Sequence, residues 1–216
     1  MAEITEETLL MQRAFRCVMR ACSRPGLVGR IGAFDAQSAL DPYFETLTRL
    51  VVDQAVSFSC VGDEACRVAS YLKLQTHSSE AAPDRADFVL VPETESACAQ
   101  QVISQACGGT LVAPERGASV IVALRALGGR PLPGESEPEQ DDDACHRIVV
   151  SGPGVDGEET FMASDIAWAL ARAARADEYP CGIDVYLVDA KGRVVVVPRT
   201  TRNESIDGKE TGSWDM

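Results

Sequence analysis

The stretch YPCGIDVYLVDAKGRVVVVPRTT, residues 179–201, holds the clearest structural signal in this chain of 216 residues. Apolar side chains alternate over 183–187, and residues 194–197 are four consecutive valines. Two such segments around a turn at 189–193, with Gly192 available for a positive φ angle, predict a β-hairpin. A strand that is apolar on both faces is typical of a sheet covered on both sides. We therefore expect this hairpin inside an α/β domain.

Helical and extended patterns alternate along the chain before this hairpin. Asp41 followed by Pro42 is typical of a helix start, because Asp accepts hydrogen bonds from the first free amides and Pro fits the first turn. The patterns predict helices over 5–22, 41–54, 63–73, 95–106 and 161–175. They predict strands over 56–61, 87–92, 119–126 and 146–151. The segment 72–76 is also compatible with an extended form, and residues 152–160 should form a loop. This order predicts a single α/β domain over residues 1–203, with three layers (α/β/α) and a mixed sheet.

The negative charge is concentrated in two segments. The formal net charge is −13, but residues 135–143 hold six acids and no base, and residues 204–216 hold four acids and one lysine. Without these segments the net charge is −4. We expect an acidic mobile loop over 134–143 and a disordered acidic tail over 204–216. The sequence shows no basic cluster of the kind that contacts phosphates, so nucleic acid binding is not expected.

Composition also bears on location and cofactors. No window is apolar enough for a membrane span, and the amino terminus is acidic where a signal peptide would be basic, so we expect a cytoplasmic protein without membrane contact. The chain has eight cysteines and two histidines but no Cys-x-x-Cys, which favours reduced thiols over a metal site. Its three lysines, Lys73, Lys191 and Lys209, occupy solvated positions, so no Schiff-base cofactor such as pyridoxal phosphate is expected.

The end of the hairpin is the first candidate site. Pro198 cannot donate to a sheet and should end its strand, which places Arg199, Thr200 and Thr201 at a sheet edge. Such donors can converge on a small anion. They can instead have a structural role, with Arg199 paired to an acid and the threonines capping backbone groups. The sequence favours this second interpretation. Asp184 is the natural partner for Arg199 across the hairpin.

Three further turns resemble this one in composition. Ser23 begins a polar turn over 23–26, and Glu115 lies in another over 114–117, so both join the candidate ligand-binding or interface residues. Gly152-Pro-Gly154 follows a predicted strand as a phosphate loop would. However, three acids and no lysine follow it, which favours a plain turn.

These motifs, in this order, resemble the PhnH family of the bacterial carbon–phosphorus (C–P) lyase system. The resemblance covers about residues 15–203 and is most specific in the final hairpin with its flanks. The motifs are Phe15-Arg16 with Met19, 23–26, 50–53, 71–76, 86–91, Gly109-Thr110, 114–119, 152–154, 179–184 and 198–201. Arg24 departs from the family pattern, in which an acid is common there, and the insert 134–143 and the tail after Glu204 are extra.

The resemblance implies a fold similar to pyridoxal-phosphate-dependent transferases, without the cofactor or its lysine. It also implies a homodimer that joins the subunits PhnG, PhnI and PhnJ. That assembly transfers the ribose triphosphate of ATP to an alkylphosphonate with release of adenine, and the expected role here is an accessory one. The alternative is a stand-alone small-anion or nucleotide-binding protein, or a transferase, that holds a phosphonate or ATP through Arg199 and its neighbours.

Overall fold

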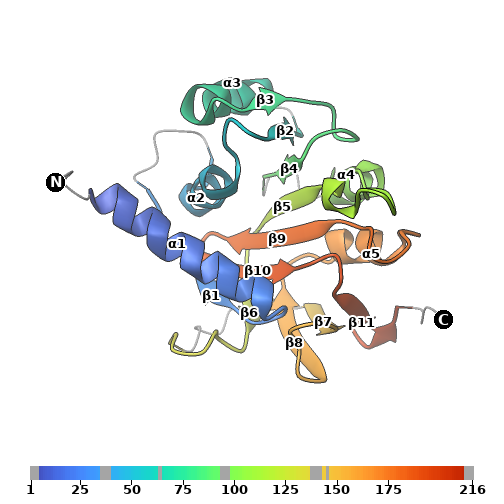
Figure 1. Cartoon of the computed structure of the whole chain (residues 1–216). Helices are drawn as coiled ribbons and strands as arrows, with labels where there is room; N and C mark the ends of the chain where they lie inside the picture. The colour runs from blue at the N-terminus through green and yellow to red at the C-terminus, as the bar shows by residue number, and fades with distance from the viewer. Residues whose placement is uncertain are drawn as a thin grey trace.

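The computed structural model describes residues 5–34, 40–62, 65–92, 98–136, 143–144 and 146–211 (Figure 1). A mixed seven-stranded sheet lies in the middle, in the order β1-β10-β9-β5-β4-β2-β3. The pairs from β9 to β3 are parallel, and β10 is antiparallel to both of its neighbours. Its strands are β1 (Gly29–Arg30), β2 (Ser57–Cys60), β3 (Ser79–Glu80), β4 (Phe88–Val91), β5 (Ser119–Leu124), β9 (Asp184–Asp189) and β10 (Arg193–Val197). The predicted α/β class, mixed sheet and terminal hairpin are thus confirmed.

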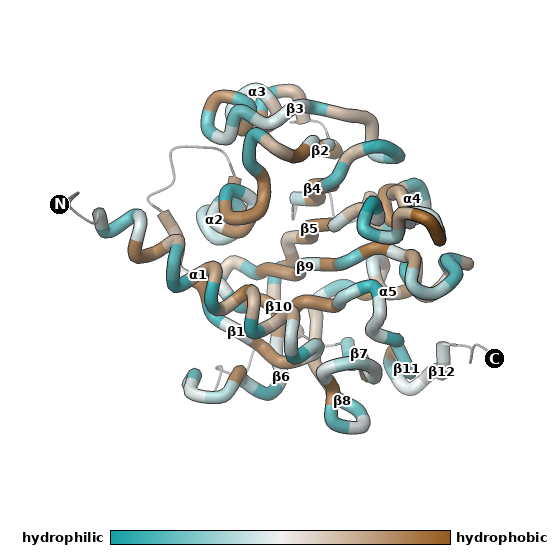
Figure 2. Tube along the Cα trace, viewed as in Figure 1, coloured by the Kyte–Doolittle hydropathy of each residue, from teal (hydrophilic) through white to brown (hydrophobic). Residues whose placement is uncertain are grey.

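Both faces of this sheet are covered. One face packs against α1 (Glu6–Ser23), α2 (Pro42–Val51) and α3 (Ala65–Thr76), and the other against α4 (Ala99–Gln105), α5 (Ala167–Ala173) and a second sheet. Side chains alternate between the two cores, so Val194 and Val196 belong to the first and Val195 and Val197 to the second. All four valines are buried, as predicted. Figure 2 shows the corresponding apolar colour along β9 and β10.

The second sheet was not predicted. Five antiparallel strands lie in the order β12-β11-β7-β8-β6. They are β6 (Leu127–Gly129), β7 (His146–Ser151), β8 (Glu158–Ala163), β11 (Arg202–Ile206) and β12 (Lys209–Glu210). β8 overturns the predicted loop over 152–160 and the predicted helix start at 161. Phe161 and Ala163 alternate into the core, whereas Met162 between them fits a helical apolar spacing with residues 166, 169, 170 and 173, which hid the strand.

The helices follow the sequence pattern more closely. The Asp41 carboxylate caps α2 by accepting hydrogen bonds from the amides of Tyr43, at 2.9 Å, and Phe44, at 3.0 Å. The alternative extended form of 72–76 is wrong, because α3 continues to Thr76. The predicted starts of the helices at 63 and 95 lie outside the described residues. Each described helix is too short or too polar to cross a lipid bilayer.

The two acidic segments differ in what the structure describes. Residues 204–211, predicted to be disordered, form the end of β11, a turn and β12, because Asn203 and Ile206 are buried and pair with β7. Residues 212–216 lie outside the described residues. So does most of the predicted acidic loop, although Glu135 at its start lies 3.7 Å from Arg20 of α1.

Phe161 joins the second sheet to α5, and this contact provides a test of the core. Its ring stacks on Trp168 with the centroids 6.2 Å apart, and both side chains are fully buried. Phe161→Ala should lower the free energy of unfolding by about 3–5 kcal/mol, because it leaves a cavity between the layers. Urea denaturation measures this loss. Leu74→Ala, at a side chain that is 75% exposed, should change stability by less than about 0.5 kcal/mol, and similar losses for both would contradict the packing.

Candidate functional site

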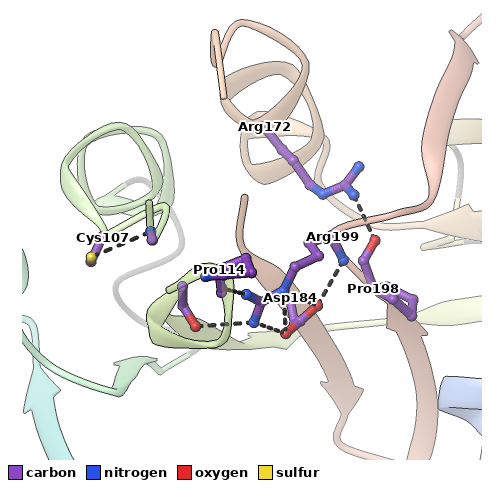
Figure 3. Close-up of polar contacts among 8 residues, drawn as sticks. Cys107, Pro114, Arg172, Asp184, Pro198 and Arg199 are labelled. Atoms are coloured by element: carbon purple, nitrogen blue, oxygen red, sulfur yellow. Dashed lines mark hydrogen bonds and ion pairs between the residues drawn. The ribbon is translucent and has the colours of Figure 1, made fainter. Parts of the chain in front are cut away.

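The open end of the β9–β10 hairpin is closed by Arg199 and Asp184 (Figure 3). The backbone amide of Arg199 donates to Oδ1 of Asp184 at 2.7 Å, and its Nη2 donates to Oδ2 at 2.5 Å. Nε adds longer hydrogen bonds to both oxygens, at 3.3 and 3.2 Å. The side chains are only 17% and 20% exposed. The partner predicted for Arg199 is therefore confirmed.

The rest of the guanidinium binds the turn before β5. Nη1 of Arg199 donates to the carbonyl of Pro114, and Nη2 donates to the carbonyl of Gly117 at 3.1 Å. Glycine is required at 117 by close approach, since a Cβ atom there would lie 2.2 Å from the carbonyl oxygen of Gly182. Every nitrogen of the Arg199 side chain thus donates within the protein, which leaves little of it to hold a ligand.

Electrostatics reinforces this pairing. Hydrogen bonds to Asp184 raise the pKa of Arg199, against the opposing effect of burial. The guanidinium therefore keeps its charge at any pH at which the protein is folded. A charge-assisted, bidentate pair of this kind fixes geometry as well as contributing energy.

A second arginine, which sequence reasoning missed, supports the same turn from α5. Nη2 of Arg172 donates to the carbonyls of Pro198, at 2.8 Å, and Thr201, at 2.7 Å, and Nη1 donates to Oδ1 of Asn203 at 3.3 Å. Burial of the guanidinium lowers the pKa of Arg172 to about 10, so it is still protonated at neutral pH. No signal in the sequence marks this role, because α5 must first be packed beside β11.

The two threonines lie in this turn. Thr201 is buried, its amide donates to the carbonyl of Pro198 at 2.9 Å, and its Oγ1 has no hydrogen-bond partner in the described structure. Thr200 is half-buried. A Cβ atom at Gly152 would lie 3.0 Å from the carbonyl oxygen of Thr200, and Gly152 has a φ angle of +124°. The predicted plain turn at 152–154 thus packs against the candidate residues.

Ser23 and Glu115 take positions around this centre. The hydroxyl of Ser23 donates to the carbonyl of Arg20 at 2.9 Å, at the end of α1. The backbone of Ser23 lies against Gly154, where a Cβ atom would come within 2.5 Å of its carbonyl oxygen. Glu115 is exposed on the short 3₁₀ helix η2 (Pro114–Arg116), whose carbonyl at Pro114 binds Arg199. The structure therefore joins Arg199, Asp184, Thr200 and Thr201 directly, and the other two through neighbouring turns.

The position of this cluster in the fold bears on its chemistry. Asp184 begins β9, and the turn at 114–117 leads into β5, so the cluster lies at the amino ends of the parallel strands. Open α/β sheets commonly bind ligands at the opposite, carboxyl ends. Among the described residues, no three His, Cys, Asp or Glu side chains gather as a metal site. The arrangement chiefly fixes the turns at 23–26, 114–117, 152–154 and 198–201 to one another.

Comparison with known sequences agrees with the motifs. The sequence profile of the family described as "Bacterial phosphonate metabolism protein (PhnH)" matches residues 3–204. The chain belongs to the PhnH family. It is also 30% identical over 200 residues to "Alpha-D-ribose 1-methylphosphonate 5-triphosphate synthase subunit PhnH" of Rhizobium meliloti (strain 1021), covering 89% of this chain and 90% of that protein.

Several of the motifs that carry the resemblance to PhnH meet in space. The turn at 114–117 and the segment 181–184 meet at Gly117 and Gly182, and the amide of Gly182 donates to the carbonyl of Gly108 at 2.7 Å. Arg199 joins this group to residues 198–201, the turn at 152–154 packs against Thr200, and the turn at 23–26 packs against Gly154. These turns of the family signature therefore form a connected series.

The thiols of this PhnH chain differ in their surroundings. Cys17 lies on the buried side of α1. Its burial, and to a smaller extent the charge of Glu135, raises its pKa to about 12. Burial also raises the pKa of Cys22. Cys66 on α3 is exposed. Since the thiolate is the reactive form, the buried thiols are poor nucleophiles.

Replacing the carboxylate of Asp184 tests the closure of the hairpin. Asp184→Asn should lower the free energy of unfolding by about 2 kcal/mol, because it leaves the Arg199 charge without its counter-ion. Asp84→Asn is the matched control, since Asp84 and Arg85 form an exposed pair at 3.9 Å, and it should change stability by less than about 0.5 kcal/mol. Equal effects in chemical denaturation would show that the hairpin does not depend on this pair.

Alkylation tests the inertness of Cys17. With iodoacetamide at about pH 8, Cys66 should react in the native protein while Cys17 stays unmodified, because its raised pKa leaves almost no thiolate. Peptide mass spectrometry measures both sites, and labelling in denaturant serves as the control. Native labelling of Cys17 at the rate of Cys66 would contradict its burial.

Proposed function

We propose that this chain is an accessory subunit of the C–P lyase core complex in organophosphonate catabolism. The proposal is supported by the family match over nearly the whole chain and by a relative whose name describes a synthase subunit. One structural observation carries the accessory role. Arg199 and Asp184, the candidate ligand-binding groups, bind each other and the turn at 114–117.

In this proposal the complex transfers the ribose triphosphate of ATP to an alkylphosphonate and releases adenine. The other subunits, PhnG, PhnI and PhnJ, assemble around this chain, which does not catalyse the transfer alone. A catalyst of this reaction must stabilise a departing base and a charged triphosphate, and both need donors that are free to meet the substrate. Arg199 and Arg172 are instead used by the turns.

Three further properties belong to the proposal. The fold is similar to that of pyridoxal-phosphate-dependent transferases, but the chain uses no cofactor. The Lys73 ammonium forms an ion pair with Glu80 at 2.6 Å, and Lys191 is exposed at a turn, so neither is placed to form a Schiff base. The chain forms a homodimer, and it acts in the cytoplasm.

Reconstitution tests the proposal. The purified chain alone should release no adenine from ATP and methylphosphonate, whereas the co-expressed set of subunits should do so only when this chain is present. Chromatographic detection of adenine measures both. Full activity of the set without this chain would contradict the accessory role.

Calorimetry with the isolated chain tests the alternative. We expect no measurable binding of ATP, methylphosphonate or pyridoxal phosphate. Binding of ATP that Arg199→Lys abolishes without a change in melting temperature would favour a stand-alone anion-binding protein.

A further inference from the structure

The exposed side of α1 has a charge opposite to that of the whole chain. Between residues 8 and 34 the sequence has no acid, whereas the full chain has a net charge of −13. Arg13, Arg16 and Arg20 recur every three or four residues and therefore form one stripe along the helix, and Arg24 follows at its C-cap. All four are exposed, and so is Arg30 of β1, an edge strand that contacts α1.

The sequence places Arg13, Arg16 and Arg20 on the polar faces of the predicted helix over 5–22, although it shows no run of adjacent Lys or Arg. The helix brings the arginines together, because residues three and four apart lie on the same side. Within the described part of the chain, Arg20 is balanced in part by Glu135 at 3.7 Å. Arg13, Arg16 and Arg24 form no ion pair there. Their charge is therefore available to a partner.

Two apolar side chains form a second row on the exposed side of α1, where Met19 lies next to Arg16, three residues away. Phe15 and Met19 are one helical turn apart, and each is 52% exposed. The inner side of the same helix is already buried through Ala14, Cys17 and Ala21, so the exposed pair is not needed for packing. Figure 1 shows α1 lying over β10 with its length open on the outside. Apolar anchors beside arginines are the composition that protein interfaces favour.

The charge decides which kind of partner fits. A second copy that pairs α1 with α1 about a twofold axis would place arginines against arginines, which is unfavourable. An anionic membrane or DNA presents negative charge over an extended surface, which would also meet the acidic remainder of this chain with its net charge of −13. A protein surface with carboxylates beside an apolar patch complements both halves of the face.

We infer that the α1 face, defined by Arg13, Arg16, Arg20, Arg24, Phe15 and Met19, is the docking surface for an acidic, partly apolar surface of another subunit of the synthase. This inference rests on the proposed function. The arginines guide the approach and set the orientation of the partner, and Phe15 with Met19 forms the part of the contact from which water is excluded.

Association with the other subunits tests the inference. The co-expressed, affinity-tagged remaining subunits are immobilised, and binding of the full chain is measured between about 50 and 300 mM NaCl. Arg13→Glu with Arg16→Glu should weaken binding at low salt by at least about tenfold, and so should Phe15→Ser with Met19→Ser. The wild-type affinity should fall as salt rises, and the charge-reversed variant should lose this dependence.

Matched controls separate docking from folding. Arg85→Glu reverses an exposed charge elsewhere, and Leu74→Ser removes an exposed apolar side chain on α3; both should bind within about twofold of wild type. Thermal melting should be unchanged in all variants, since the substituted side chains are exposed.

Other results would overturn the inference. Wild-type affinity in both α1 variants would do so while leaving the proposed function intact. A wild-type dimer in sedimentation that the α1 variants dissociate, with subunit binding retained, would assign the face to a second copy. Salt-dependent binding of the wild type to anionic phospholipid vesicles or to DNA, lost in the charge-reversed variant, would assign it to those ligands. No association of the wild-type chain with the subunits would overturn both proposals.

Discussion

Burial of both faces of the β9–β10 hairpin is the constraint on which the rest of the structure depends. Residues 185, 187, 195 and 197 enter one core, and residues 188, 194 and 196 enter the other. Water therefore has little access to the polar groups at the ends of these strands, and their charged side chains find partners within the protein. Two Asp–Arg pairs meet this need, one at each end of the hairpin.

At the turn end, Asp189 and Arg193 are almost completely buried, with side chains 0% and 1% exposed. The Asp189 carboxylate accepts hydrogen bonds from the amides of Lys191, Arg193 and Leu127, each at 2.9 Å. At the open end, Asp184 and Arg199 close the hairpin against the turn at 114–117. Such pairs add little net stability, but loss of one partner is costly, so they mainly specify one arrangement.

The polar side chains that hold the fold and those that are available to a partner lie in different parts of the molecule. The polar residues that mark the PhnH signature are largely used inside the protein, where they hold turns from distant parts of the chain. The groups still available lie elsewhere, along the outer side of α1. A subunit whose role is assembly needs this combination, because a rigid scaffold presents its binding surface without a large entropic cost on association.

The sequence predicted the helices of the first layer, the parallel strands and the pairing of Arg199 with Asp184, because each depends on neighbours in the chain or across one hairpin. It missed the second sheet. The β8 residue Met162 fits an apolar helical pattern with Ile166 and residues of α5, and only pairing of β8 with β7 and β6 selects the strand. It also missed Arg172, whose acceptors lie 26 to 31 residues away.

The sequence by itself therefore determined the α/β class, the central hairpin and, through its ordered motifs, the PhnH family. Local periodicity and short-range pairing are sufficient for these features. Only the tertiary structure decided that Arg199 also binds the turn at 114–117, that Arg172 supports the turn at 198–201, and that the arginine side of α1 stays exposed. These features depend on which distant segments pack together, because buried polar groups must find partners there and because packing decides which side of a helix is covered.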